Sequence, residues 1–412
     1  MTPPPFFARY RRQRPLPGTW QLEGGDKGYT GAIVIPALAE SESLFLTLDA
    51  LAATPPVTGE RFLAVIVVNA RADAPDAEQY DNQRTLQRLH NAPPLRPDLD
   101  LTWVDATSVG KELPPNAGVG LARKIGFDLA LERLAGPQSL LISLDADTLV
   151  EASYLRALTD HFAASTSGGA VLPFRHQHAA TPDLQEAVDR YELYLHGYRL
   201  GLELAGSPYA FHTIGSAFAC RASAYCAAGG MNRRHAGEDF YFLQQLARTS
   251  GVAQLVGTTV HPSPRISHRT PFGTGQSVAA YAAGRNDITL YPIEAFLLLR
   301  QTLQLLASGH NRTAQMILED AAQIVESLAT FLEQQKLRAI WPKLQQTHRE
   351  SQRFQHAVST WFDGLKSLRL LRFASDPFGG TLPVDEAIPP LLAAAGLTSE
   401  GGPSDWLERL RC

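Results

Sequence analysis

Three things are scarce in this sequence of 412 residues, and each absence excludes a class of protein. Only three cysteines occur (Cys220, Cys226 and Cys412), too few for a disulfide framework and without a CxxC pair for structural zinc. No uninterrupted run of about 18 apolar residues is present, so we predict no membrane-spanning helix. The formal net charge is only −4, which removes the global electrostatic reason to predict nucleic-acid binding.

The start of the chain also lacks the long apolar core of a secretory signal, which together with the few cysteines predicts a cytoplasmic protein. Residues 1–28 hold five prolines and four arginines, with no acid before Glu23. Proline removes backbone donors and like charges repel, so we predict an irregular basic arm. We expect it to lie against its own domain. The alternative is a peripheral contact with the anionic inner face of a membrane, because Phe6, Phe7 and Tyr10 accompany the arginines.

Apolar periodicity predicts an α/β region in the first two thirds of the chain. Short continuous apolar runs, typical of strands covered on both faces, alternate there with helical patterns. The strand signals lie at 32–36, 62–70, 101–106, 140–147, 168–174 and before Arg221, and the helical patterns at 40–53, 118–134 and 184–204. This alternation predicts a mostly parallel sheet flanked by helices.

Beyond about residue 276 the strand signals disappear. Apolar residues recur there at helical spacing over 295–307, 313–337 and 354–371. The stretch 376–390 is rich in proline and glycine and is predicted to be a loop. We therefore predict an α/β domain over residues 29–284 and a helical C-terminal region over residues 285–412.

Two aspartates, Asp145 and Asp147, stand at the end of the strongest strand signal. At the carboxyl end of a strand in an open parallel sheet, the chain enters the edge where ligands bind. Acids so close together repel unless a cation neutralises them, and their oxygens suit Mg²⁺ or Mn²⁺. A metal held in this way would bind a diphosphate. The alternative is that the two acids cap the following turn or helix, together with Thr148 and Glu151.

A second acidic pair, Glu238 and Asp239, opens a helical pattern after a glycine-containing stretch. A carboxylate in such a position can act as a general base toward an acceptor hydroxyl. Acids at a helix N-terminus are also stabilised by the helix dipole, so capping alone is a sufficient explanation of this pair.

Two basic segments accompany these acids. Arg123 and Lys124 lie near the start of the helical pattern at 118–134, where cations can meet the phosphates of a nucleotide. A solvated helix face is the alternative. The segment 261–276 holds two histidines, two arginines and little acid among its prolines and glycines. This composition is that of a basic lid over a diphosphate, or of a plain surface loop.

In this order, the segments resemble the GT-A glycosyltransferases of the family 2 type. Ala32–Glu42 is similar to the opening strand of the family with its Pro-x-x-x-Glu segment, and Val119–Gly126 to the segment before the DxD strand. Leu144–Thr148 is similar to the DxD motif itself. The most specific likeness is Gly215–Leu246, with a strand, an arginine, two glycines and the Glu-Asp pair. The resemblance covers about residues 29–280 and leaves the helical C-terminal region without a counterpart.

This resemblance implies a hexosyltransferase with a GT-A domain that moves a sugar from a UDP- or GDP-sugar to an acceptor hydroxyl. Asp145 and Asp147 would hold Mg²⁺ or Mn²⁺, with His261 or His268 completing the metal shell. Asp239 would be the base, giving inversion, and Glu238 would position acceptor or sugar. The residues implied in binding the nucleotide sugar are Pro36, Ala37, Glu40, Asn69, Arg123, Lys124, Asp145, Arg265 and Arg269.

One departure concerns the second strand, where Asn69 stands in place of the acid pair with which the family usually contacts the base. The sugar, the base and the acceptor (a glycan, a lipid-linked molecule or a small molecule) stay open. In a retaining relative, Asp239 would bind sugar instead of acting as base. A non-catalytic nucleotide-sugar-binding module would keep the DxD motif but has no use for Glu238 and Asp239.

Two other enzyme classes fit the sequence less well. The phosphatase signature of two closely spaced acids needs Thr or Val where this chain has Leu149. A nucleotidyltransferase needs a glycine-rich basic loop after the first strand, and the segment Pro36–Ser43 contains neither glycine nor a basic residue.

Overall fold

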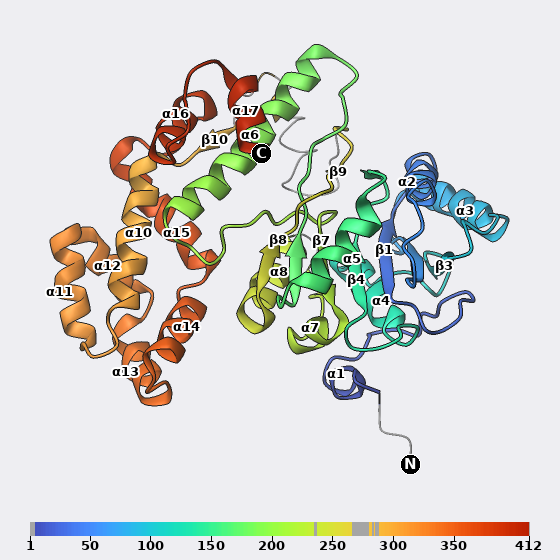
Figure 1. Cartoon of the computed structure of the whole chain (residues 1–412), viewed down its shortest axis with the longest axis horizontal. Coiled ribbons are helices and arrows are strands. Elements are labelled where there is room, and N and C mark those ends of the chain that lie inside the picture. The colour runs from blue at the N-terminus through green and yellow to red at the C-terminus, as the bar shows by residue number, and fades with distance from the viewer. Residues whose placement is uncertain (1–4, 235–236, 266–279, 282–283, 285–287, 412) are drawn as a thin grey trace. The chain divides into compact units, whose positions relative to one another are not determined.

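The computed structural model describes residues 5–234, 237–265, 280–281, 284 and 288–411. The chain forms two compact units (Figure 1). The first comprises Met1–Ala179 and Thr213–Gln276, and the second Ala180–His212 and Ser277–Cys412. Helix α6 (Pro182–Leu204) therefore belongs to the second unit, although it lies within the range 29–284 that the sequence assigns to the α/β domain.

A seven-stranded sheet forms the centre of the first unit, in the order β3-β2-β1-β4-β7-β6-β8. Its strands are β1 (Gly31–Ala37), β2 (Phe62–Asn69), β3 (Leu99–Ala106), β4 (Leu140–Ser143), β6 (Gly169–Val171), β7 (Phe218–Arg221) and β8 (Val252–Gln254). Four pairings are parallel, and only β7 runs antiparallel to its neighbours β4 and β6. The mostly parallel α/β sheet predicted from the sequence is confirmed.

The pair β1–β4 is the topological switch point of this sheet. From β1 the chain continues to β2 and β3 on one side, whereas β4 pairs with its other side. Connections from the carboxyl ends of such a pair diverge, and ligands of open α/β sheets bind at this edge. Glu40 follows β1, and Asp145 and Asp147 follow β4, so the sheet topology brings these three acids to one edge.

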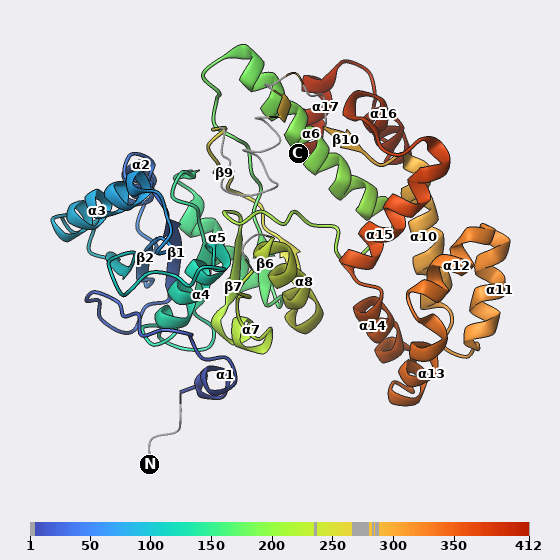
Figure 2. The same cartoon turned by 180° about the vertical axis from the view of Figure 1, so that it is seen from behind.

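Helices flank the sheet of the first unit. They are α1 (Ala8–Gln13), α2 (Ser43–Ala52), α3 (Asp76–His90), α4 (Val119–Ala130), α5 (Tyr154–Ala164), α7 (Ala222–Ala227) and α8 (Glu238–Ser250). Seen from behind, α3 lies beside β2 and α8 beside β6 (Figure 2). A short ribbon of β5 (Leu149–Val150) and β9 (Val260–His261) follows the aspartates.

Helix α4 packs directly on β1 and β2 because it carries glycine at the contact. A Cβ at Gly126 would lie 2.3 Å from Cγ1 of Val34 and 3.0 Å from Cγ2 of Val67. These valines are completely buried, so a side chain at position 126 would push the helix away from the sheet. The close approach sets the distance between α4 and the sheet, and thereby decides which residues of α4 contact neighbouring elements.

The basic arm lies against its own unit, as expected, but it is not irregular throughout. Residues Ala8–Gln13 form α1, and Tyr10 is buried. The Tyr10 hydroxyl donates a hydrogen bond to Oδ1 of Asp128 (2.7 Å) and accepts one from Nζ of Lys124 (2.6 Å). Arg11 donates to the Asp128 carbonyl (2.9 Å) and pairs with Glu132. The buried contacts of Tyr10 stabilise this short helix, because most helical stability in proteins comes from the packing of one face.

In its described residues, the second unit has one two-stranded ribbon, β10 (Thr289–Leu290) with β11 (Leu382–Pro383), and its other elements are helices. Besides α6 it contains α10 (Ile293–Ala307), α11 (Ala314–Ile324), α12 (Glu326–Gln334), α13 (Leu337–Thr347), α14 (Ser351–Trp361), α15 (Gly364–Ser375), the 3₁₀ turn Asp376–Phe378, α16 (Val384–Ala394) and α17 (Pro403–Arg411). Gly197 and Gly201 bring α6 close to Ile388 and Phe296. The predicted helical region is confirmed.

The structure subdivides two of the helical patterns, and the predicted loop is wrong. The patterns at 313–337 and 354–371 each break into two helices, at Val325 and near Phe362. The predicted loop at 376–390 contains most of α16, with Pro389 and Pro390 inside the helix. The prolines lie away from the buried face formed by Val384, Ala387, Ile388, Leu391 and Leu392, so apolar burial outweighs two lost backbone hydrogen bonds.

None of the described helices is both long enough and apolar enough to span a membrane.

Candidate active site

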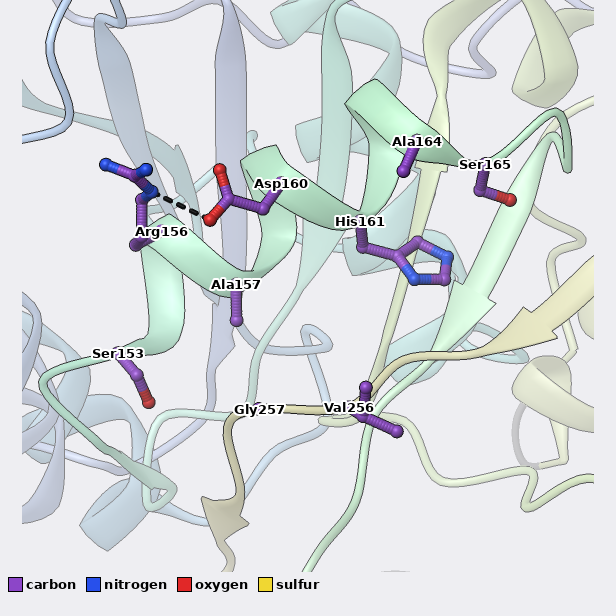
Figure 3. Close-up of a pocket in the computed structure, with 9 residues that line it drawn as sticks. All are labelled: Ser153, Arg156, Ala157, Asp160, His161, Ala164, Ser165, Val256 and Gly257. Carbon is purple, nitrogen blue, oxygen red and sulfur yellow. Dashed lines mark hydrogen bonds and ion pairs between the residues drawn. The ribbon is translucent and has the colours of Figure 1, made fainter.

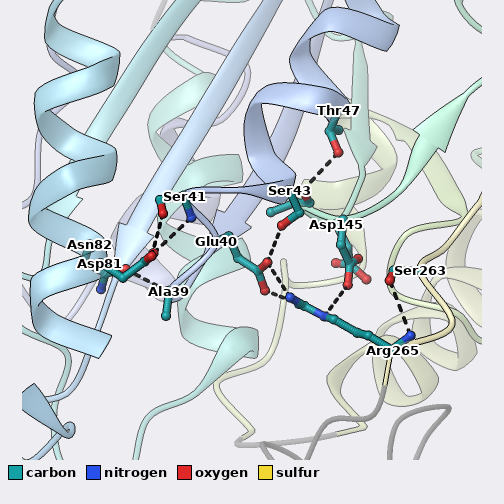
Figure 4. A network of polar contacts seen from close by, with 12 residues as sticks. Ala39, Glu40, Ser41, Ser43, Thr47, Asp81, Asn82, Asp145, Ser263 and Arg265 are labelled. Carbon is teal, nitrogen blue, oxygen red and sulfur yellow. Dashed lines mark hydrogen bonds and ion pairs between the residues drawn. The ribbon is translucent and has the colours of Figure 1, made fainter. Parts of the chain in front are cut away.

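The loop between β1 and α2 places Glu40 at the sheet edge, and helix α3 holds this loop in position. Ala39 adopts a left-handed backbone conformation (φ 49°), which turns the chain after β1. The Ala39 amide donates to Oδ1 of Asn82 (2.8 Å), and the Ser41 amide donates to Oδ1 of Asp81 (3.0 Å). Figure 4 shows these contacts beside the Glu40 carboxylate, which accepts a 2.5 Å hydrogen bond from Ser43.

The two aspartates after β4 lie on a tight turn that neighbouring side chains support. The Thr148 amide donates to the Asp145 carbonyl (3.2 Å), which closes the turn. The buried Thr47 of α2 donates to the carbonyl of Ala146 (3.0 Å), between the aspartates. Gln177 donates to the carbonyls of Asp147 (2.9 Å) and of His261 (2.7 Å). Thr47 and Gln177 thereby hold the backbone of the turn through its carbonyls, and the two carboxylates stay available for other contacts.

Arg265 joins the two loops. Its guanidinium pairs with both oxygens of Glu40, one of them at 2.8 Å, and its Nε lies 2.9 Å from Oδ2 of Asp147. Figure 4 shows Arg265 extending from the segment after β9 toward Glu40. The Arg265 side chain is 38% exposed, whereas those of Glu40 and Asp147 are 6% and 19% exposed. An accessible cation therefore covers two largely buried anions.

Arg123 of α4 forms the second arginine contact, deeper in the unit. One of its terminal nitrogens pairs with Asp145 and the other with Glu238, while Nε donates to the Ser143 hydroxyl (3.1 Å). The guanidinium packs on Gly215, where a Cβ would approach it to 2.3 Å. Arg123 and Glu238 are buried, and the Asp145 side chain is 35% exposed. Arg123 thus links the end of β4 to the start of α8.

The Glu238–Asp239 pair begins α8, and its two acids have different surroundings. Glycine at position 237 takes a left-handed conformation (φ 70°) before the helix, and Asn232 donates to the Glu238 carbonyl (2.7 Å). Glu238 is fixed by Arg123. Asp239 makes no ion pair among the described residues, and its Oδ1 accepts a 2.7 Å hydrogen bond from the Phe240 amide. Glycine at position 120 allows α4 to approach this segment closely.

Burial changes the protonation of two of these acids. It raises the pKa of Asp147 to about 7; the Arg265 guanidinium opposes this rise, and the Asp145 carboxylate adds to it. Burial also raises the pKa of Asp239 to about 6, against the opposing charge of Arg123. Asp239 is therefore a carboxylate at pH 7 that holds a proton more strongly than an ordinary aspartate does, which suits a general base.

The remaining predicted site residues lie in three kinds of place. Pro36 and Ala37 form the buried end of β1. Asn69, also buried, ends β2, and its Oδ1 has no hydrogen-bond partner among the described residues. Lys124 lies in a separate buried cluster, where it donates to Asp128 (2.8 Å) and to the hydroxyl of the docked arm. His268 and Arg269 fall outside the described residues.

His261 lies near the aspartates, but its ring is directed elsewhere. Nδ1 lies 3.0 Å from the Arg175 carbonyl, and Nε2 lies 3.4 Å from the Glu151 carboxylate. Both aspartate carboxylates pair with arginines, and the alternative in which they cap the following turn or helix stays open.

The donor atoms at this edge suit a divalent cation, although arginines hold them here. In the described part of the chain, no three His, Cys, Asp or Glu side chains form a ready metal-binding group. Mg²⁺ and Mn²⁺ sites at phosphates need only one or two carboxylates, with water and phosphate oxygens as the other ligands. Asp147 and Asp145 fit this donor set, on the condition that Arg265 leaves Asp147.

A pocket of about 560 Å³ lies elsewhere on the first unit, along α5 (Figure 3). Its lining residues are Ser153, Arg156, Ala157, Asp160, His161, Ala164, Ser165, Val256 and Gly257. Its charged side chains, Arg156 and Asp160, pair with each other at 2.7 Å and are exposed. Burial and the nearby Arg221 lower the pKa of His161. None of the predicted site residues lines this pocket.

Sequence reasoning missed the residues that support the site. Asp81, Asn82, Thr47 and Gln177 hold the loops of the acids, and Gly215 makes room for Arg123. Their partners are mostly backbone groups distant in the sequence, so no local pattern marks them.

Comparison with solved structures finds similar chains among nucleotide-sugar enzymes. TarS from S. aureus in complex with UDP-GlcNAc is 12% identical, with a TM-score of 0.40 over 82% of this chain and 91% of that chain. A mannosyltransferase from Pyrobaculum calidifontis in complex with GDP-Man and Mn²⁺ is 15% identical, with a TM-score of 0.38 over 98% and 90%. Glucosyl-3-phosphoglycerate synthase from Mycobacterium tuberculosis in complex with UDP is 13% identical, with a TM-score of 0.34 over 63% and 80%.

No protein-family model and no curated protein sequence matches this chain.

Proposed function

We propose that this chain is a GT-A glycosyltransferase that moves a sugar from a UDP- or GDP-sugar to an acceptor hydroxyl. The observation that carries the proposal is the gathering of Glu40, Asp145 and Asp147 at the β1–β4 switch point, with Glu238 joined to them through Arg123. Acids that lie at a ligand-binding edge and pair with arginines, two of them with partly exposed carboxylates, indicate a site for a charged ligand.

The donor would bind along the carboxyl ends of β1, β2 and β4. Pro36 and Ala37 would line the nucleotide, and the buried amide of Asn69, which lacks a partner for Oδ1 in the described structure, would meet the base. Asp147 and Asp145 would hold Mg²⁺ or Mn²⁺, which when bound supplies positive charge to the diphosphate. Arg265 would add a planar pair of donors suited to phosphate oxygens.

Transfer would proceed with inversion. Asp239 is the proposed base, because it lacks an ion pair in the described residues and its raised pKa of about 6 suits proton uptake near neutrality. It would accept the proton of the acceptor hydroxyl as that oxygen attacks the anomeric carbon and the bond to the diphosphate breaks. Glu238, held by Arg123, would fix the start of α8 so that Asp239 keeps its position.

A panel of nucleotide sugars tests the proposal. UDP-GlcNAc and GDP-Man, the donors in the similar solved structures, are the first probes, with and without MnCl₂. Stabilisation of the full chain by one donor with the metal, followed by release of the nucleotide on addition of an acceptor, supports the enzyme. Donor binding without turnover for any acceptor supports a nucleotide-sugar-binding module, and retained anomeric configuration in the product supports the retaining alternative.

A further inference from the structure

Arg265 supplies the positive charge that lies between two loops of the site. It contacts Glu40 with two nitrogens and Asp147 with a third, so one guanidinium neutralises acids from the loops after β1 and after β4. All five N–H groups of a guanidinium point outward in one plane, and here three nitrogens of that plane face carboxylates. A metal ion at Asp147 would lie beside the guanidinium that pairs with Oδ2 of Asp147, so the two positive charges would repel each other there.

The charges at this edge do not balance. Among the described residues, Glu40, Asp145, Asp147, Glu238 and Asp239 supply five acidic side chains, and Arg123 and Arg265 supply two guanidiniums. Asp147 is only partly ionised near neutral pH, because burial raises its pKa to about 7. A diphosphate arriving alone would therefore meet a site with excess negative charge. A divalent cation at Asp147 would reduce that excess, and its charge would repel the Arg265 guanidinium.

The two arginines differ in how freely they can move. Arg123 is buried and is fixed by Asp145, Glu238, Ser143 and the close packing of Gly215. Arg265 is 38% exposed and emerges from the segment that follows β9. Arg265 can leave the partly exposed Asp147 and keep Glu40 at a lower cost than Arg123 can leave Glu238, because the Arg123–Glu238 pair is buried on both sides.

We propose that Arg265 couples the cation to the diphosphate: it holds Glu40 and Asp147 until a divalent cation takes Asp147, and it then turns to the donor phosphates. This inference rests on the proposed function. Without nucleotide, Arg265 and the cation compete for Asp147. With nucleotide, the released guanidinium gains a new partner, so cation and nucleotide strengthen each other's binding. Because linkage is reciprocal, both titrations must report the same coupling factor.

The first test is the binding of Mn²⁺ alone to the full chain, measured from the signal of free Mn²⁺ by electron paramagnetic resonance. Arg265→Gln removes the competing charge, so we expect the variant to bind Mn²⁺ about tenfold more tightly than the wild type does. Arg84→Gln is the matched control, because Arg84 pairs with Glu42 at the surface, near the same loop. We expect it to leave Mn²⁺ affinity unchanged.

The second test is the binding of UDP and of GDP at saturating Mn²⁺. Here Arg265→Gln should weaken the better nucleotide about tenfold, because the guanidinium no longer reaches the diphosphate. Arg265→Lys, which keeps the charge but not the planar fork, should fall between wild type and Arg265→Gln. The opposite signs of the two effects separate this role from a general loss of structure, which would weaken both ligands.

Three results would overturn the inference. Equal or weaker Mn²⁺ binding by Arg265→Gln would show that Arg265 does not compete with the cation. Absence of Mn²⁺ binding in both proteins would show that the acids form no cation site. If Arg265→Gln tightens Mn²⁺ binding but neither UDP nor GDP binds the wild type, the competition stands, whereas the coupling and the proposed function both fail.

Discussion

Two neighbouring cations of helix α4, Arg123 and Lys124, belong to two different ionic clusters, and the comparison separates the proposed ligand site from a structural cluster. Arg123 pairs with Asp145, whose side chain is 35% exposed, and with Glu238. Lys124 pairs with Asp128, which is completely buried and also accepts hydrogen bonds from Tyr10 and Tyr225. Successive residues of a helix point in directions about 100° apart, so adjacent cations reach different neighbours.

The two clusters differ in whether their charged groups all have partners inside the protein. We call a cluster closed when they do, and open when one of its charged groups is partly exposed. In the Lys124 cluster, the amine and both carboxylate oxygens of Asp128 already have partners within hydrogen-bonding distance. Burial still lowers the pKa of Lys124, against the opposing charge of Asp128. The Arg123 cluster ends at a partly exposed carboxylate beside Asp147 and Arg265. A closed cluster can only stabilise the fold, whereas an open one can exchange a partner for a ligand.

The largest effect should follow from Asp239→Asn, at the open cluster. Loss of the base should lower kcat about 10²–10⁴-fold, while the Kd of the nucleotide changes little. In the wild type, kcat/KM should rise with pH through about 6, because the base acts only after it has lost its proton. Steady-state kinetics between pH 5 and 9 measure kcat and kcat/KM, and calorimetry with UDP or GDP measures the Kd.

Protein stability supplies an independent readout for the same residue. The pKa of Asp239 lies above the ordinary value of 3.8, so the native state holds this proton more strongly than the unfolded chain does. The resulting stabilisation is complete below about pH 4 and is lost as the pH rises through about 6. Asp239→Asn should therefore unfold at a higher temperature than wild type at pH 8. Turnover near the wild-type value, or a lower Tm at pH 8, would contradict the assignment.

At the closed cluster, Asp128→Ala should lower the stability of the protein and leave nucleotide binding almost unchanged. This change leaves the buried Lys124 without its carboxylate, so we expect a loss of about 3–5 kcal/mol in the free energy of unfolding. Nucleotide affinity of the folded protein should stay within about twofold, because Asp128 lies outside the proposed site.

Glu132→Ala is the matched control for Asp128→Ala. Glu132 follows the same helix and pairs with Arg11 at the surface, so the expected loss is about 0–1 kcal/mol. Urea unfolding of both variants provides the comparison. Equal losses in the two variants, or selective loss of nucleotide binding in Asp128→Ala, would show that the closed cluster is not purely structural.

An effect smaller than that of Asp128→Ala should come from Tyr10→Phe, which tests the docking of the arm. The ring keeps its edge-on contact with Tyr225, at 5.6 Å between ring centroids, but the hydroxyl between Lys124 and Asp128 is lost. A loss of about 1–3 kcal/mol in unfolding free energy is expected, because two hydrogen bonds of a buried cluster disappear. A variant as stable as the wild type would indicate that the arm is not held in solution.

The strands and the acids after them could be predicted from the sequence because local patterns encode them. The runs that become β1, β2 and β4 are continuously apolar, and parallel strands require exactly such burial on two faces. Asp145 and Asp147 were recognisable from their place after β4, and Glu238 and Asp239 from the glycine before a helix. Whether these acids function in catalysis stays a prediction.

The partners of these residues could not be predicted, because they depend on contacts between distant segments. Nothing local distinguishes Arg123 from Lys124, yet the packing of α4 on the sheet gives them different roles. The same holds for Arg265 and Glu40, which are 225 positions apart. In α16 the local signal even points the wrong way, because burial of one helix face outweighs Pro389 and Pro390.

The central claim is that Asp147 helps to bind a nucleotide through a divalent cation. Its most direct test is calorimetric titration of UDP and GDP at saturating Mn²⁺ into the full chain, as wild type and as Asp147→Asn. Asp147→Asn removes one charge from the edge between β1 and β4 and no core volume, so its Tm at pH 8 should not fall. The account predicts that the wild type binds one of the two nucleotides and that the variant binds it at least tenfold more weakly. Equal affinity in the two proteins, or equal wild-type affinity in the presence of EDTA, would contradict it.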